Sequence, residues 1–198
     1  NGVPAALTDP GTIAYSDVDL TDTHSASAAF ASSSAGGQLG ALSASVTTGT
    51  TNGTGGVVCW NYSVNDRAVQ YLGVGDSITE TYTVTLTDGE TGGAVTRDVV
   101  VTITGTNDGP TLKQAIDDQH TNEDAAYSFN VSANFNDVDA TDSLTYTAKL
   151  SNGDPLPAWL SINATTGVLS GTPANGNVGA YTVVVTATDE SNVSVSET

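Results

Sequence analysis

Short stretches in which Thr alternates with Val, Ile, Leu or Tyr constrain the fold of this chain more than any other feature. Residues 81–87 read Thr-Tyr-Thr-Val-Thr-Leu-Thr, residues 99–104 read Val-Val-Val-Thr-Ile-Thr, and residues 181–188 read Tyr-Thr-Val-Val-Val-Thr-Ala-Thr. An alternation with period two is typical of β-strands that bury one face. Turn signals recur about every 8–12 residues without a helical period, and one of them, at 88–93, predicts a hairpin between the first two stretches. The chain is therefore expected to be all-β and to form antiparallel sandwiches.

Two features predict that the chain is divided into two domains. The acidic phrase Ser-Asp-Val-Asp-Leu-Thr-Asp at 16–22 returns as Asn-Asp-Val-Asp-Ala-Thr-Asp at 136–142. The segment Gly-Thr-Asn-Asp-Gly-Pro at 105–110 reads as a linker, because Pro110 cannot donate to a sheet and Gly109 permits a bend. A chain of 198 residues can hold two domains of ordinary size. The predicted domains are residues 1–108 and 109–198.

The charge balance points to cations and away from nucleic acid. The chain carries 22 acidic and 4 basic residues, a formal charge of −18. Nucleic acid and anionic membranes are unfavourable partners, because phosphate binding needs Lys and Arg. Clustered carboxylates also repel one another and weaken a compact fold unless cations offset their charge.

The repeated phrase itself predicts calcium binding. Calcium takes about six to eight oxygen ligands, mostly carboxylate and carbonyl. In each phrase two Asp stand at i and i+2, and on an extended segment they would project to the same side. These pairs are Asp17 with Asp19 and Asp137 with Asp139. Asp22 and Asp142 are open to two interpretations, as additional ligands or as residues that begin a turn.

Other chemistries are not indicated. The acidic phrases lack the Gly and Glu that an EF-hand loop requires. One Cys and two His provide neither a four-ligand zinc site nor a recognisable catalytic triad. The segment 75–78, Gly-Asp-Ser-Ile, begins like an esterase signature, but Ser77 leads into a predicted strand. No stretch approaches the roughly 20 apolar residues of a membrane-spanning helix. Neither an enzyme nor membrane insertion is expected.

Several motifs resemble known repeat families. Residues 11–108 resemble the VCBS repeat of giant bacterial surface proteins, through Leu-Gly-Ala-Leu at 39–42, Trp-Asn-Tyr-Ser-Val at 60–64, the run 75–84 and the run 101–108. Residues 109–198 resemble the dystroglycan-type cadherin-like domain. That similarity is carried by Asn-Glu-Asp at 122–124, Pro-Ala-Trp-Leu at 157–160, the run 166–173 and the run 181–189.

The resemblance implies immunoglobulin-like sandwiches strung in tandem along a secreted repeats-in-toxin adhesin, with several calcium ions at the joints. It implies that the joint between the two domains draws its ligands from both. These are Asp76, Glu80, Asn107, Asp108, Glu123, Asp137, Asp139 and Asp189. The same mapping implies a second calcium site at the N-terminal pole, with Asn1, Asp17, Asp19 and Asp88. The first domain has no clear counterpart to Glu123.

The leading functional hypothesis is a calcium-rigidified extender at the bacterial cell surface, which projects a distal binding region for adhesion or biofilm formation. Its partners would be the neighbouring domains of the same long chain, and the protein is expected to be a monomer. A hypothesis from a different class is that one domain is itself the binding head for a carbohydrate or a peptide. An enzyme ranks third.

Overall fold

The computed structural model describes residues 5–19, 22–50 and 52–198. These residues form β-strands connected by loops and three single-turn 3-10 helices, η1 (Asp66–Ala68), η2 (Ser132–Asn134) and η3 (Asn175–Asn177). None of the helices in this described part is long or apolar enough to cross a membrane.

The chain divides into two compact units. Unit 1 comprises Asn1–Gln70 and Gly75–Gly105, and unit 2 comprises Tyr71–Val74 and Thr106–Thr198. The predicted boundary after residue 108 and the observed division after Gly105 both fall in the segment 105–110. The sequence patterns did not indicate that the short segment Tyr71–Val74 groups with unit 2.

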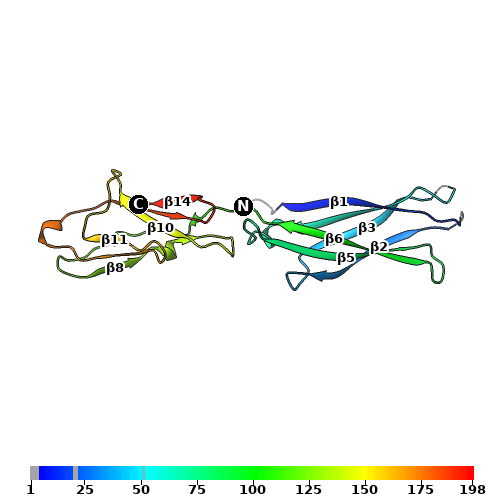
Figure 1. Ribbon diagram of the computed structural model, residues 1–198, viewed down its shortest axis with the longest axis horizontal. Helices are drawn as coiled ribbons and strands as arrows, with labels where there is room; N and C mark the ends of the chain where they lie inside the picture. Colours follow the sequence, from blue (N-terminus) through cyan, green and yellow to red (C-terminus); the bar gives the residue numbers. More distant parts are fainter. Residues whose placement is uncertain (1–4, 20–21, 51) are drawn as a thin grey trace. The chain divides into compact units, whose positions relative to one another are not determined.

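Unit 1 contains two three-stranded antiparallel sheets (Figure 1). The order β1-β4-β3 joins β1 (Ala6–Tyr15), β4 (Gly56–Asn65) and β3 (Gly40–Thr48). The order β2-β5-β6 joins β2 (Ser25–Ser33), β5 (Ser77–Thr87) and β6 (Ala94–Thr104). The β5–β6 pair runs from Ser77 opposite Thr104 to Thr87 opposite Ala94, which confirms the predicted hairpin.

The core of unit 1 lies where β4 and β5 present their alternating apolar residues. Val58, Tyr62 and Val64 of β4 are buried, as are Ile78, Tyr82 and Val84 of β5. The Tyr62 and Tyr82 rings meet edge to face with centroids 5.9 Å apart. The period-two burial on these two strands is the pattern expected of sheets that bury one face.

Unit 2 contains two three-stranded sheets and one short two-stranded sheet. The order β10-β13-β14 joins β10 (Thr145–Leu150), β13 (Val183–Thr188) and β14 (Ser194–Glu197). The order β11-β12-β8 joins β11 (Leu160–Ile162), β12 (Val168–Gly171) and β8 (Tyr127–Asn130). The strands β7 (Thr111–Leu112) and β9 (Phe135–Asn136) form the pair. The core between them is made of Val131, Phe135, Tyr146, Leu160, Leu169, Val185 and Ala187.

Candidate metal centre

The repeated acidic phrase forms a bend in both units, and not the extended segment expected from the sequence. Asp137 Oδ1 accepts a hydrogen bond from the backbone N–H of Asp139 at 3.0 Å. Asp17 Oδ1 accepts the equivalent bond from Asp19 at 2.9 Å. An Asp side chain that accepts from the N–H two residues on makes an Asx-turn, which curls the chain around the carboxylate. The expectation of an extended segment was wrong because this local hydrogen bond outweighs strand geometry.

In unit 2 the bend lies beside the residue that follows β13. Carboxylate oxygens of Asp137, Asp142 and Asp189 lie within 4.8 Å of one another. Asp189 is only 4% exposed, and Asp139, from the same bend, is 3% exposed. Three carboxylates at such distances repel one another strongly when they are shielded from water. The arrangement therefore requires protonation or a positive charge.

Four side-chain oxygens in this region are buried without a hydrogen-bond partner. They are Asn107 Oδ1, Asp137 Oδ2, Asp139 Oδ1 and Asp142 Oδ2. Within the described ranges the only other such atom is Trp159 Nε1. An unpaired buried polar atom costs about 1–3 kcal/mol, and charged groups cost more, so such atoms are rare in folded proteins. Their concentration makes this region the candidate site for a bound ligand.

The linker is bound to the same acidic residues. Asn107 Nδ2 donates to Asp189 Oδ2 at 2.9 Å, and the backbone N–H of Asp108 donates to Asp139 Oδ2 at 2.9 Å. Asp189 Oδ1 accepts from the backbone N–H of Val193 at 2.8 Å, which fixes its carboxylate in the β13–β14 turn. The sequence-predicted residues Asn107, Asp108, Asp137, Asp139 and Asp189 are thus brought together within unit 2.

Asp142 lies in this cluster, and its backbone N–H also donates to Asp139 O at 3.2 Å, so it has features of both sequence interpretations, a ligand and a turn residue. Burial raises the pKa of Asp142, and the charges of Asp139, Glu190, Asp137 and Asp189 raise it further. A carboxyl whose pKa is raised by neighbouring carboxylates gains most from a bound cation, because the cation removes the repulsion. The resemblance did not include Asp142 among the ligands of the joint. The bend at 137–142 also contacts segment 71–74, which the sequence did not indicate. The Tyr71 backbone carbonyl accepts a hydrogen bond from the backbone N–H of Ala140 at 3.0 Å.

The donor set fits calcium. Five residues supply the oxygens, namely Asn107, Asp137, Asp139, Asp142 and Asp189. All of the donors are carboxylate or amide oxygens, which hard cations prefer, whereas zinc selects His and Cys. The orphaned oxygens would be ligands, and backbone carbonyls or water would complete a shell of about six to eight.

Glu123 does not join this cluster. After the Asn175 side-chain amide is oriented to satisfy its hydrogen bonds, it donates to Glu123 Oε1 at 3.2 Å and Oε2 at 2.5 Å. The next residue is fixed in the same place, because Asp124 N donates to Pro173 O at 2.7 Å. Glu123 is also absent from the group of carboxylates whose oxygens lie within 4.8 Å of one another. The structure thus places Glu123 outside the group formed by Asp137, Asp142 and Asp189.

Glu80 is a structural carboxylate in the core of unit 1, and not a ligand on its surface. Its side chain is fully buried. Oε1 accepts from Leu39 N at 2.7 Å, and Oε2 accepts from Gly40 N at 3.1 Å, Tyr62 Oη at 2.7 Å and Tyr82 Oη at 3.0 Å. Burial alone would raise the pKa of Glu80, but these hydrogen bonds outweigh it and hold the pKa below its ordinary value. Because both of its oxygens are bound by core donors and the side chain is fully buried, Glu80 is not available to a metal.

Asp76 also belongs to unit 1. It immediately precedes β5, and its backbone carbonyl accepts from Gly105 N at 3.0 Å, which ties the start of β5 to the chain beyond β6. Its side chain is half-buried.

The acidic phrase of unit 1 is organised differently from that of unit 2. Asp17, Asp19 and Asp22 have carboxylate oxygens within 4.8 Å of one another. However, Asp17 Oδ2 lies 2.8 Å from His24 Nε2, a side chain that is 5% exposed. Hydrogen bonds from the Asp19 N–H and from His24 lower the pKa of Asp17. In the described part of this phrase no buried oxygen lacks a partner, so the observation that supports calcium in unit 2 is missing.

The other predicted residues of the N-terminal pole do not enlarge this cluster. Asp88 lies in the β5–β6 turn, where its Oδ1 accepts from Glu90 N at 2.8 Å, and it is outside the group of three. Asn1 lies outside the described residues. His24, which no motif singled out, was missed because its proximity to Asp17 depends on how the bend folds back.

Comparisons with known proteins give one family match and two structural similarities of low score. Residues 109–198 match the family model described as "Putative Ig domain". A search of curated proteins found no match. Among solved structures, the chain is similar to protocadherin gamma C5 EC1-3, with 12% identity, a TM-score of 0.42, and coverage of 98% of this chain and 68% of that one. It is also similar to the zebrafish RET cadherin-like domains 1 to 4, with 11% identity, a TM-score of 0.28, and coverage of 100% of this chain and 41% of that one. The predicted all-β class is confirmed by the sheets of both units, and the immunoglobulin-like assignment is supported for residues 109–198 by the family match.

Proposed function

We propose that this chain is a calcium-stabilised structural segment of an extracellular adhesion protein, and that its role is mechanical. The finer assignment, to an extender of a repeats-in-toxin adhesin at a bacterial surface, rests on the sequence resemblance of residues 11–108 and 109–198 to VCBS and cadherin-like repeats. In this proposal the partners are neighbouring domains of the same long chain, the protein is a monomer, and no catalytic step is involved.

The observation that carries the proposal is the set of buried, unpartnered oxygens in unit 2. Asn107 Oδ1, Asp137 Oδ2, Asp139 Oδ1 and Asp142 Oδ2 share a region with the buried carboxylate of Asp189. When bound, calcium supplies positive charge that neutralises the carboxylates and accepts their lone pairs. Without a cation, the same groups repel one another and weaken unit 2.

The linker residues connect this site to the mechanical role. Asn107 binds Asp189 through its amide nitrogen and has its amide oxygen unpaired, so it contacts the acidic cluster with one atom and can ligate with the other. Asp108 is held to Asp139 through its backbone N–H. A cation that draws these carboxylates together would order residues 107–108 against unit 2 and shorten the part of the linker that is free to bend.

The test compares Asp142→Asn with a matched control, Asp118→Asn. Asp142 carries an unpartnered oxygen, whereas Asp118 is exposed in the same unit. In excess chelator, Asp142→Asn should melt at the same temperature as the wild type or higher, because it removes a repelled charge. With calcium the order should reverse, because a ligand is lost. Wild-type unit 2 should gain about 2.7 kcal/mol at a calcium concentration 100 times Kd.

Calorimetry and thermal unfolding in calcium and in chelator supply both readouts. The Asp118→Asn variant should show the wild-type calcium response. Hydrogen exchange at the backbone amides of Asn107 and Asp108 should slow when calcium is added. Identical melting curves for the wild type in calcium and in chelator would refute the proposal.

A further inference from the structure

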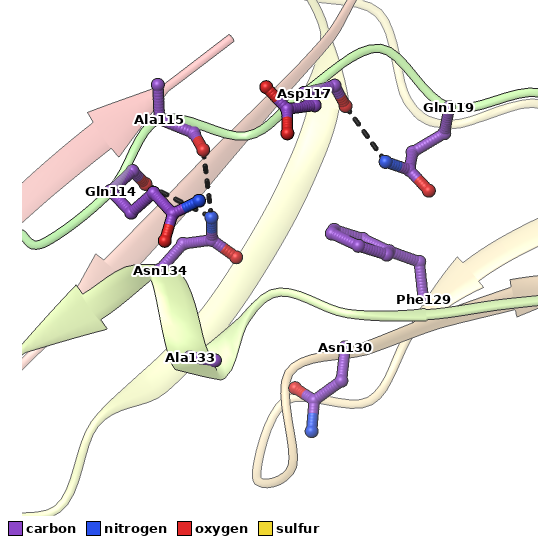
Figure 2. Close-up of a pocket in the computed structure, with 8 residues that line it drawn as sticks. All are labelled: Gln114, Ala115, Asp117, Gln119, Phe129, Asn130, Ala133 and Asn134. Atoms are coloured by element: carbon purple, nitrogen blue, oxygen red, sulfur yellow. Dashed lines mark hydrogen bonds between the residues drawn. The ribbon is translucent and has the colours of Figure 1, made fainter.

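A pocket of about 260 Å³ lies in unit 2, apart from the residues of the candidate metal centre (Figure 2). It is bounded by the coil that follows β7, by the end of β8 and by η2. Gln114, Asp117 and Gln119 come from the coil, Phe129 and Asn130 from β8, and Asn134 from η2. The volume suits one side chain or one small polar molecule.

Asn134 presents a fixed hydrogen-bond acceptor to this pocket. Its side chain is buried, at 9% exposure, and its Nδ2 donates to the carbonyl oxygens of Gln114 and Ala115, both at 3.1 Å. Rotating the amide by 180° would set Oδ1 against two carbonyl oxygens, so these bonds decide the orientation. Oδ1 accepts no hydrogen bond from the described residues and is directed toward the pocket in Figure 2.

The coil adds two further acceptors. Gln119 Nε2 donates to the backbone carbonyl of Asp117 at 3.0 Å, which leaves its Oε1 as the free end of that amide. The exposed Asp117 carboxylate can only accept when ionised. The pocket lining, all of it within the described ranges, includes no Lys, Arg or His.

Phe129 supplies the apolar wall. Its ring is half-buried, packs against the core of unit 2 on one side, and faces the pocket opposite Asp117 in Figure 2. An aromatic face carries partial negative charge and attracts cations within about 6 Å of the ring centroid. The ring therefore adds to the preference set by the oxygens.

We propose that this pocket binds an alkylammonium group, such as that of a lysine side chain or an amino sugar. An ammonium is donor-only, with three N–H bonds to distribute, and Asn134 Oδ1, Gln119 Oε1 and the Asp117 carboxylate are acceptors with one negative charge among them. Asn130 presents a donor, because its Oδ1 accepts from Ser132 N at 2.9 Å, so the preference for a cation rests on the charge of Asp117. A neutral sugar hydroxyl carries no charge to pair with the Asp117 carboxylate, and so lacks the interaction that favours an ammonium most. Residues 106–198 contain only two basic residues, Lys113 and Lys149, so the field of unit 2 favours a cation.

The proposal is independent of the calcium proposal and is tested at constant calcium concentration. The full chain labelled with ¹⁵N is titrated with Nα-acetyl-lysine methylamide, glucosamine and N-acetylglucosamine, and the side-chain amide signals of Asn134 and Gln119 are followed. The two ammonium compounds should shift these signals, with Kd on the order of millimolar, and N-acetylglucosamine should not. Binding of lysine alone or of glucosamine alone supports the site and identifies its source.

Two variants make the test specific. Asp117→Asn should weaken ammonium binding at least about fivefold and remove most of its salt dependence, because it deletes the only charge in the pocket. Asp118→Asn, the neighbouring exposed carboxylate, should bind as the wild type does. Equal binding of N-acetylglucosamine and glucosamine, no shift with any of the three compounds, or an Asp117→Asn affinity equal to that of the wild type would each overturn the proposal.

Discussion

Replacement of Glu80 by Gln should destabilise unit 1 more than any other single exchange of a carboxyl for an amide in that unit. Glu80 is fully buried, and its two oxygens accept four hydrogen bonds from two backbone N–H groups and two tyrosine hydroxyls. Every group directed at the carboxylate is therefore a donor. The pKa of Glu80 lies below its ordinary value, so the ionised form is the one that the core stabilises.

The size of the effect follows from the geometry. If the Gln carbonyl takes the place of Oε2, its NH₂ faces the Leu39 N–H, which loses its acceptor. A buried donor without an acceptor costs about 1–3 kcal/mol, and the three remaining bonds lose the extra strength of a charged acceptor. Relief from burying a charge offsets part of this loss. We expect about 2–4 kcal/mol, or a fall in the melting temperature of unit 1 of about 10–25 °C.

Urea unfolding followed by Trp60 emission measures this loss, in a Trp159→Phe background so that only unit 1 reports. Glu90→Gln, in the exposed β5–β6 turn, is the matched control and should change the free energy of unfolding by less than about 0.5 kcal/mol. The pKa of Glu80 is lowered on folding, so its stabilisation is present above its unfolded pKa of about 4.3 and is lost as the pH falls through the folded value. The difference between wild type and Glu80→Gln should therefore shrink in acid. A difference below 1 kcal/mol at pH 7, or one that does not change with pH, would refute the reasoning.

Three further outcomes are expected. Burial and the neighbouring Glu80 carboxylate raise the pKa of Tyr62. Unit 1 should therefore lose stability as the pH rises above about 10, where tyrosine in the unfolded chain ionises. In unfolding curves recorded at alkaline pH, Tyr62→Phe should lose less stability over this range than the wild type. Gly171→Ala should destabilise unit 2 by about 1–3 kcal/mol or more in chemical denaturation, because a Cβ would overlap the Trp159 carbonyl oxygen, whereas Gly176→Ala has open space and should be nearly neutral. Asn107→Ala should reduce the rise in melting temperature that calcium causes. In chelator, its melting temperature should stay within a few degrees of that of the wild type. A calcium response equal to that of the wild type would show that Asn107 is not a ligand.

The local part of the fold could be predicted from sequence. The β5–β6 hairpin follows from alternating residues on either side of a Gly-rich turn, and the observed register places Thr87 opposite Ala94 across it. Alternation and turn chemistry act over a few residues, so a linear pattern contains the information needed. Each acidic phrase was wrongly expected to be an extended segment. The alternation of polar and apolar residues carries no information about an Asp side chain that accepts a hydrogen bond from the backbone two residues on.

The acidic residues show where sequence reasoning reaches its limit. Glu80 and Glu123 are chemically suitable ligands that the resemblance assigned to the joint, yet one is enclosed by two tyrosines and the other is bound to Asn175. Asp142 was left open between a ligand and a turn residue, and its neighbours place it in the cluster. In each case the deciding contact comes from a part of the chain that is distant in sequence.

The sequence by itself determined that the chain is all-β, that one hairpin forms at 88–93, and that it carries a large excess of carboxylates. These properties depend on composition and on interactions between near neighbours. Only the tertiary structure decided which carboxylates meet. The unit 2 cluster joins residues from 107, 137–142 and 189, while Glu80 is satisfied by residues 39, 40 and 62. Whether a carboxylate binds a metal or a donor group of the core depends on which groups surround it in the folded chain. Those neighbours are set by how the strands pair within the sandwich.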